Sequence, residues 1–194
     1  MADKPRILQD GKDLIWSLIA LGVIILVVAG IAGSCSWGFG SDASEQKVPH
    51  FDVSEGLHAD ASAMPFPIRE PTVPRAWQPN SGSTQEIGDK LSSNVGWITE
   101  GGAYVQLTQT DATEEKLVRS LLGDEVSGTG TQDIGGQMWV TYENLEDHQK
   151  AWIVDLGDVR VGVKSRGRDE SMRVLADGVM AAQPIASDRP KPIG

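Results

Sequence analysis

The chain has 194 residues, of which 40% are hydrophobic, and a formal net charge of -10 at pH 7. This length accommodates one ordinary domain with a packed core, plus a segment or two. The acidic balance argues against nucleic-acid binding, because a phosphate-binding surface needs clustered Lys and Arg. The single cysteine excludes an intramolecular disulfide.

The first predicted element is a transmembrane helix at residues 14–33. No charged residue occurs in residues 14–41, and residues 14–31 are nearly continuous Leu, Ile, Val, Ala and Gly. This run is long enough to cross a bilayer core and longer than the apolar region of a cleaved secretory signal. We therefore expect an uncleaved signal anchor that spans the membrane once.

Charges on the two sides of this helix predict its orientation. Lys4, Arg6 and Lys12 precede it, whereas acidic residues predominate just after it. Positive residues near a membrane helix favour the cytoplasmic side. We therefore expect residues 1–13 in the cytoplasm and the rest of the chain outside the plasma membrane.

Small residues recur at a spacing of four near the end of the predicted helix. Ala29 precedes Gly33 by four positions, and Gly30 precedes Ser34 in the same way. This spacing lets a second helix approach closely. The expected partners are the lipid bilayer and either another membrane protein or a second copy of the chain.

Cys35 follows this stretch and leaves several interpretations open. Gly33 and Ser34 suit lipidation of the thiol, but Ala32 stands where a lipobox usually has Leu. The alternatives are an unmodified interfacial thiol, palmitoylation or a disulfide between subunits. The sequence does not decide among them.

An extracytoplasmic domain is expected at residues 51–183, after a flexible Gly- and Ser-rich linker at residues 34–50. Asp52 and Glu55 resemble a capping box, which predicts a short helix that ends before Pro65. Residues 64–83 contain five prolines. They predict an extended connector, with Trp77 held against the core.

Three hairpins and two further helices are predicted next. The hairpin turns lie at Gly101 and Gly102, at Gly135 and Gly136, and at Gly157 and Asp158. One helix follows a Thr113 cap and ends at Gly123. The last helix begins behind Asp169 and has one apolar face, formed by Met172, Leu175, Ala176, Val179 and Met180.

Hairpins in series with separate helices predict an α+β domain. We expect an antiparallel sheet with the helices packed on one face. The Pro-rich residues 184–194 predict a loose tail.

Three stretches resemble a known family. They are KPRILQDGKDLIWSL at residues 4–18, GWITEGGAYVQLTQTDATEEKLV at residues 96–118 and IGGQMWVTYE at residues 134–143. They are similar to the actinobacterial family called domain of unknown function 4245, and the first stretch is the most specific. The resemblance implies a single-pass envelope protein and assigns no activity to any residue.

No motif in the chain indicates an enzyme. The histidines lack the spacing of a zinc helix, and no phosphate loop, nucleophile elbow or dinucleotide fingerprint occurs. Acidic residues gather in two predicted turns, which we interpret as solvated loops, with weak calcium binding as the alternative. The residues concerned are Glu143, Glu146, Asp147 and His148 in one turn and Asp155 and Asp158 in the other. We expect no catalytic residue, no metal and no cofactor.

One basic patch is a candidate contact for an anion, an acidic lipid headgroup or a partner. Asp169 lies within it, so internal salt bridges are the alternative. The patch consists of Lys164, Arg166, Arg168 and Arg173.

Three tryptophans lie on predicted strands, at Trp97, Trp139 and Trp152. They have two interpretations, a place in the core or a place in an apolar groove or interface. The preferred function is a non-enzymatic accessory or interaction subunit of an envelope or membrane complex. The alternative is a tethered module that binds a lipid or a small ligand.

Overall fold

A computed structural model describes Trp16, residues 18–25 and residues 51–186. The chain divides into two units, Met1–Gln46 and Lys47–Gly194. In the first unit Trp16 and residues 18–25 are helical. Among the described residues, no helix is both long enough and apolar enough to span a membrane. Most of the predicted span at 14–33 and all of the predicted linker at 34–50 lie outside the described residues, and so do Ala29, Gly30, Gly33, Ser34 and Cys35.

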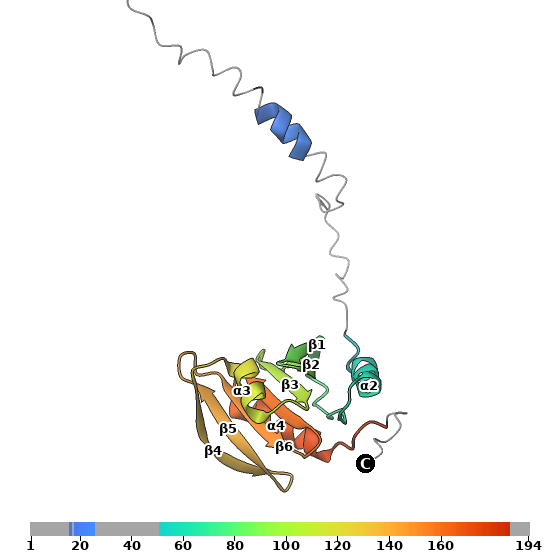
Figure 1. The fold of residues 1–194 in the computed structure, drawn as a ribbon, viewed down its shortest axis with the longest axis vertical. Helices are drawn as coiled ribbons and strands as arrows, with labels where there is room; N and C mark the ends of the chain where they lie inside the picture. Colours follow the sequence, from blue (N-terminus) through green and yellow to red (C-terminus); the bar gives the residue numbers. More distant parts are fainter. Residues whose placement is uncertain (1–15, 17, 26–50, 187–194) are drawn as a thin grey trace, which may run out of the picture. The chain divides into compact units, whose positions relative to one another are not determined.

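The second unit is built on one antiparallel sheet of seven strands (Figure 1). The strands are β1 (Gln78–Ile87), β2 (Lys90–Ile98), β3 (Tyr104–Thr110), β4 (Val126–Ile134), β5 (Gln137–Asn144), β6 (Lys150–Asp155) and β7 (Arg160–Ser165). The helices of this unit are α2 (Val53–Ala63), α3 (Glu114–Leu122) and α4 (Asp169–Ala181). The predicted α+β class and antiparallel sheet are confirmed.

The sheet consists of two meanders joined at its centre. Its order is β1-β2-β3-β7-β6-β5-β4, so each strand neighbours the next in sequence except where β3 pairs with β7. That central pairing aligns Leu107 with Val163. Strands β1 and β4 are the two edges.

The helices cover both faces of the sheet, so the prediction that they pack on one face is wrong. Helices α2 and α4 share a core with Val161 and Val163. Helix α3 packs in a second core with Ala151 and Ile153. Because successive side chains of a strand point to opposite faces, strands β6 and β7 need cover on both sides. A near-continuous apolar run such as that of β6 is typical of a strand buried on both faces.

The predicted caps and turns are confirmed. Asp52 accepts a hydrogen bond from the Glu55 backbone N–H at 3.0 Å and begins α2. Thr113 begins α3, and Gly123 ends it with φ +86°. Glycines with positive φ also form the three predicted hairpin turns, because this conformation is strained for residues with a Cβ.

Two boundaries differ from the sequence prediction. The extended connector ends at Trp77, and β1 begins at Gln78 although the next residue is Pro79. An edge strand tolerates proline because one row of its backbone groups has no strand partner. The first residues of the predicted loose tail are attached, since the Ile185 N–H donates to the Ile68 carbonyl at 2.8 Å.

Candidate functional site

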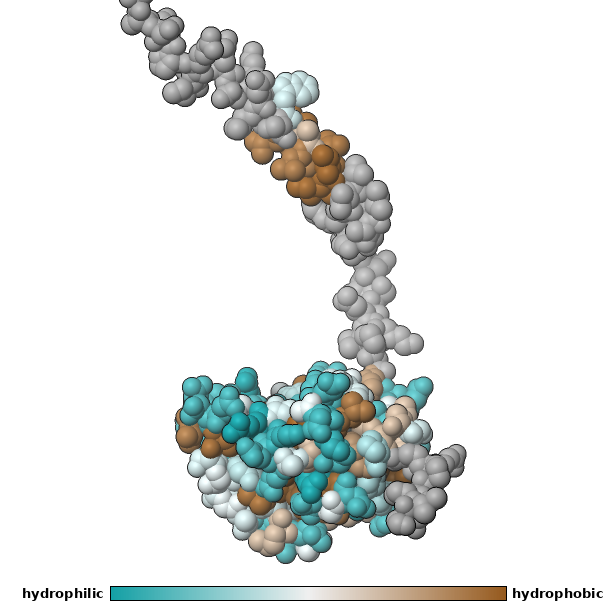
Figure 2. Space-filling view, in the orientation of Figure 1, coloured by the Kyte–Doolittle hydropathy of each residue, from teal (hydrophilic) through white to brown (hydrophobic). Residues whose placement is uncertain are grey.

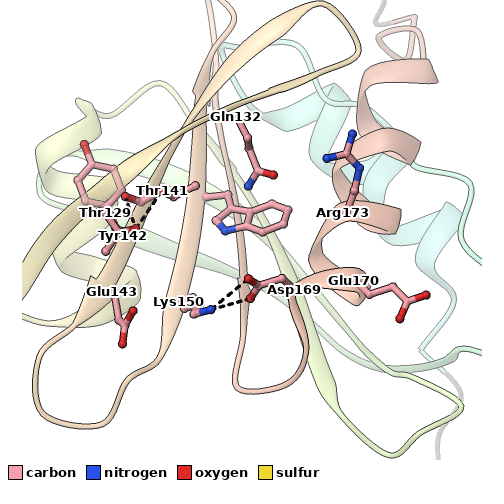
Figure 3. A pocket seen from close by; sticks show the side chains of 10 residues that line it. Thr129, Gln132, Thr141, Tyr142, Glu143, Lys150, Asp169, Glu170 and Arg173 are labelled. Atoms are coloured by element: carbon pink, nitrogen blue, oxygen red, sulfur yellow. Dashed lines mark hydrogen bonds and ion pairs between the residues drawn. The ribbon is translucent and has the colours of Figure 1, made fainter.

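A polar hollow of about 430 Å³ lies on the sheet face that α4 covers (Figure 3). Strands β4, β5 and β6 form one side of it, and the amino end of α4 forms the other. The lining residues are Thr129, Gln132, Thr141, Tyr142, Glu143, Lys150, Trp152, Asp169, Glu170 and Arg173. We call this site the polar hollow.

The strand register explains why these side chains meet. Thr141 pairs with Trp152 and Glu143 pairs with Lys150 across β5 and β6, so all four lie on one face. Gln132 lies on the same face of β4, opposite Trp139 of β5. Figure 3 shows Gln132 and Arg173 projecting from opposite sides of the hollow.

An ion pair joins the two sides of the polar hollow. The Lys150 Nζ donates to both carboxylate oxygens of Asp169, at 2.9 and 3.1 Å (Figure 3). Near it, the Thr129 and Thr141 hydroxyls lie 2.9 Å apart and form a hydrogen bond across β4 and β5. The strands and α4 are thus connected through charged and hydroxyl groups at this position.

The four predicted basic residues do not form one patch. Arg173 lines the polar hollow and lies 3.9 Å from Asp177, whereas Arg166 lies 3.3 Å from Asp147. Arg168 is the residue before α4 and makes no side-chain cap.

Lys164 lies on the opposite face of the sheet from Arg173. Its Nζ donates to the Leu121 carbonyl at the end of α3 at 3.1 Å. Burial lowers the pKa of the Lys164 amine, and the nearby Arg166 charge adds to this effect. Arg166 and Arg173 therefore lie near acidic residues other than Asp169, which pairs with Lys150, while Lys164 binds a helix end.

The three candidate tryptophans are buried. Trp97, Trp139 and Trp152 have exposed fractions of 1%, 0% and 4% and belong to the core that α2 and α4 share. Of the three, Trp152 alone lines the polar hollow. The structure thus places these three side chains in the core.

The two acidic turns have local structural partners. His148 Nδ1 lies 2.8 Å from a Glu143 oxygen, and Glu146 and Asp147 donate backbone N–H groups to the Asn144 side chain. In the second turn the Gly157 N–H donates to Asp155 at 2.8 Å, which lowers the pKa of the Asp155 carboxyl. No group of three or more potential metal ligands gathers within the described ranges.

Tyr142 also borders the polar hollow, but its phenol lies on the α3 face. The hydroxyl donates to Glu114 at 2.7 Å. Burial, together with this hydrogen bond to a carboxylate, raises the pKa of Tyr142 from 10.0 to about 12. Because the pKa of Tyr142 is raised in the folded chain, its hydroxyl holds the proton more tightly there than in the unfolded chain.

We expect the resulting stability to be present below pH 10 and to be lost as the pH rises from 10.0 toward about 12. Ultraviolet titration of tyrosinate should show a late component that the Tyr142→Phe variant lacks. Since the chain has two tyrosines, the remaining signal of that variant belongs to Tyr104. A wild-type titration without this late component would contradict the Tyr142–Glu114 contact.

A comparison with protein families gives one match. The model of a family described as "Protein of unknown function (DUF4245)" matches residues 6–179. The chain belongs to this family. The match includes the predicted membrane segment, the whole sheet and most of α4. No curated protein and no solved structure matches the chain significantly. The DUF4245 description assigns no reaction.

Proposed function

We propose that the chain is a single-pass protein of the actinobacterial plasma membrane, with residues 1–13 in the cytoplasm and the folded domain outside. The uncharged residues 14–41 and the basic residues before them support this proposal. The described helical residues 18–25, a mostly brown segment in Figure 2, support it too, since Leu18, Ile19 and Leu21 are each more than half exposed. A helix that is apolar all round is typical of a membrane or of a large protein core.

In this location the domain would act as a non-enzymatic accessory or interaction subunit of an envelope or membrane complex. The open edge strand β4 carries this proposal. Its nine residues pair with β5 on one side only. The strand contains no Lys, Arg or Pro and a single acidic residue, Asp133. Natural proteins commonly use such charges and prolines to block an edge against other chains.

The opposite edge strand, β1, differs from β4 in containing a proline, Pro79. Both edge strands shift register once, β1 between Pro79 and Ser81 and β4 between Gly128 and Gly130, and both contact a helix. Beside the β4 edge, Met138 and Leu145 have exposed fractions of 57% and 61%, against 39% for Leu91 beside β1. An extended segment of a partner can add to such an edge through backbone hydrogen bonds, with apolar side chains adding contact area.

Co-purification tests this function. The full-length chain is tagged at its carboxyl terminus, native membranes are solubilised in mild detergent, and the bound proteins are quantified by mass spectrometry. We expect a stoichiometric membrane or envelope partner. Changing Ser127 and Thr131 of β4 to Lys should lower its recovery about tenfold or more, because charges oppose strand addition at an edge.

The matched control places one charge on the other edge, as Gln85→Lys in β1, where the side chain is exposed. This variant should recover the partner as well as the wild type does. Recovery of the chain alone, or of a partner that the β4 variant retains, would contradict docking through β4.

A second candidate function is a tethered ligand-binding module. The observation that favours it is the polar hollow, whose volume of about 430 Å³ lies within the range of small-molecule sites, roughly 300–1,000 Å³.

A further inference from the structure

The chemistry of the polar hollow narrows the class of ligand that it suits. Its lining contains both hydrogen-bond donors and hydrogen-bond acceptors. Arg173 and Lys150 are donors only, the carboxylates accept only, and Gln132 and the two threonines can do both. A ligand with many hydroxyl groups can meet all of these, since each hydroxyl both donates and accepts.

The charges in the polar hollow disfavour an ionic ligand. Two cationic side chains, Lys150 and Arg173, stand among three carboxylates, those of Glu143, Asp169 and Glu170. An anion would meet the carboxylates beside the amino end of α4, and Asp169 already neutralises the Lys150 charge. A cation would meet Arg173. Since burying an unpaired charge is costly, a neutral ligand fits this nearly balanced set best.

An apolar ligand fits poorly for a different reason. It would cover the Lys150–Asp169 ion pair and the Thr129 and Thr141 hydroxyls without replacing their contacts with water. Two aromatic residues line the wall, but the Tyr142 phenol lies on the α3 face and the Trp152 side chain is only 4% exposed. The fixed polar groups of the lining suit the hydroxyl-bearing edges of a sugar ring.

We infer that the polar hollow binds a neutral saccharide. This inference rests on the second proposed function, ligand binding in the hollow, and names its ligand class. Gln132 from β4 and Arg173 from α4 are the residues expected to contact the sugar hydroxyls, because they project from opposite sides of the opening (Figure 3). The Lys150–Asp169 pair bridges the two sides of the polar hollow.

A glycan array tests the inference on the full chain in lipid nanodiscs, since sugar-headed detergents would compete for the site. The array carries neutral oligosaccharides of glucose, galactose, mannose, arabinose and N-acetylglucosamine. We expect binding to at least one of them, followed by calorimetry with that sugar. Gln132→Leu and Arg173→Leu should each weaken binding about tenfold, the size of one lost hydrogen bond to a ligand.

The control variant is Gln137→Leu, which makes the same change at an exposed position of β5 outside the hollow. It should bind the sugar as the wild type does, and circular dichroism should show that all the variants are folded. Absence of binding on the array overturns the inference. So does binding that Gln132→Leu and Arg173→Leu leave within about twofold of the wild type.

A parallel thermal-shift screen distinguishes the absence of saccharide binding from the absence of any ligand binding in the polar hollow. The wild type and Gln132→Leu are compared with amino acids, nucleotides and inorganic phosphate. A compound that stabilises only the wild type, when no saccharide binds, overturns the saccharide class and retains a ligand site in the hollow. No response in either assay overturns both.

Discussion

Replacing Trp139 by alanine is expected to lower the free energy of unfolding by about 3–5 kcal/mol. The side chain has an exposed fraction of 0% and lies in the core shared by α2 and α4. Truncation to alanine removes its packing and leaves a cavity that the surrounding strands fill only in part. Urea denaturation of residues 47–194, which form one compact unit, measures the change by circular dichroism.

Two further variants separate packing from polarity at this position. The Trp139 indole N–H has no hydrogen-bond partner among the described residues. Trp139→Phe should therefore cost clearly less than Trp139→Ala, because it removes an unpaired buried donor, which costs about 1–3 kcal/mol. Met138→Ala, next to it and 57% exposed, should change stability by less than about 1 kcal/mol. An equally small effect of Trp139→Ala would contradict its place in the core.

Local features of the fold could be predicted from the sequence because their causes are local. Asp52 and Thr113 cap helices through backbone groups three residues away. The glycines of the hairpin turns supply positive φ wherever they occur in the fold. These signals depend on a few adjacent residues, so no knowledge of the tertiary structure was needed.

The side of the sheet that each helix covers is not a local property. The apolar stripes of α3 and α4 look alike in the sequence, and neither indicates which face of the sheet it meets. The informative signal is in the strands, since residues 151–154 of β6 are all apolar and all buried. A strand covered on one face only would alternate apolar and polar residues.

The polar hollow was not predictable for a similar reason. Lys150 and Asp169 are 19 positions apart, and their contact depends on how α4 returns to the sheet. In the sequence Asp169 indicates the start of a helix, and Lys150 is an ordinary first residue of a strand. In the sequence Glu143 belongs to an acidic turn, Trp152 to a strand and Arg173 to a group of basic residues, and the fold brings all three to one site.

Replacing Gly162 by valine is expected to lower the free energy of unfolding by about 3 kcal/mol. Helix α3 lies so close to β7 that a Cβ at Gly162 would stand 2.7 Å from the Leu121 Cδ1 and 3.1 Å from the Ile153 Cδ1. Neither side chain can move freely, since both are buried in the core beneath α3. Gly128→Val in edge strand β4 is the matched control, because its nearest neighbour would be 3.8 Å away.

A double-mutant cycle shows whether the cost of valine arises from α3. Leu121→Ala alone should destabilise by about 2–5 kcal/mol, because it leaves a cavity under the helix. In the double variant the valine at 162 occupies part of that cavity, so the combined loss should be smaller than the sum of the two single losses. Additive losses would mean that Leu121 and residue 162 do not touch. That result would contradict the packing of α3 on the sheet face opposite α4, which the sequence alone did not predict.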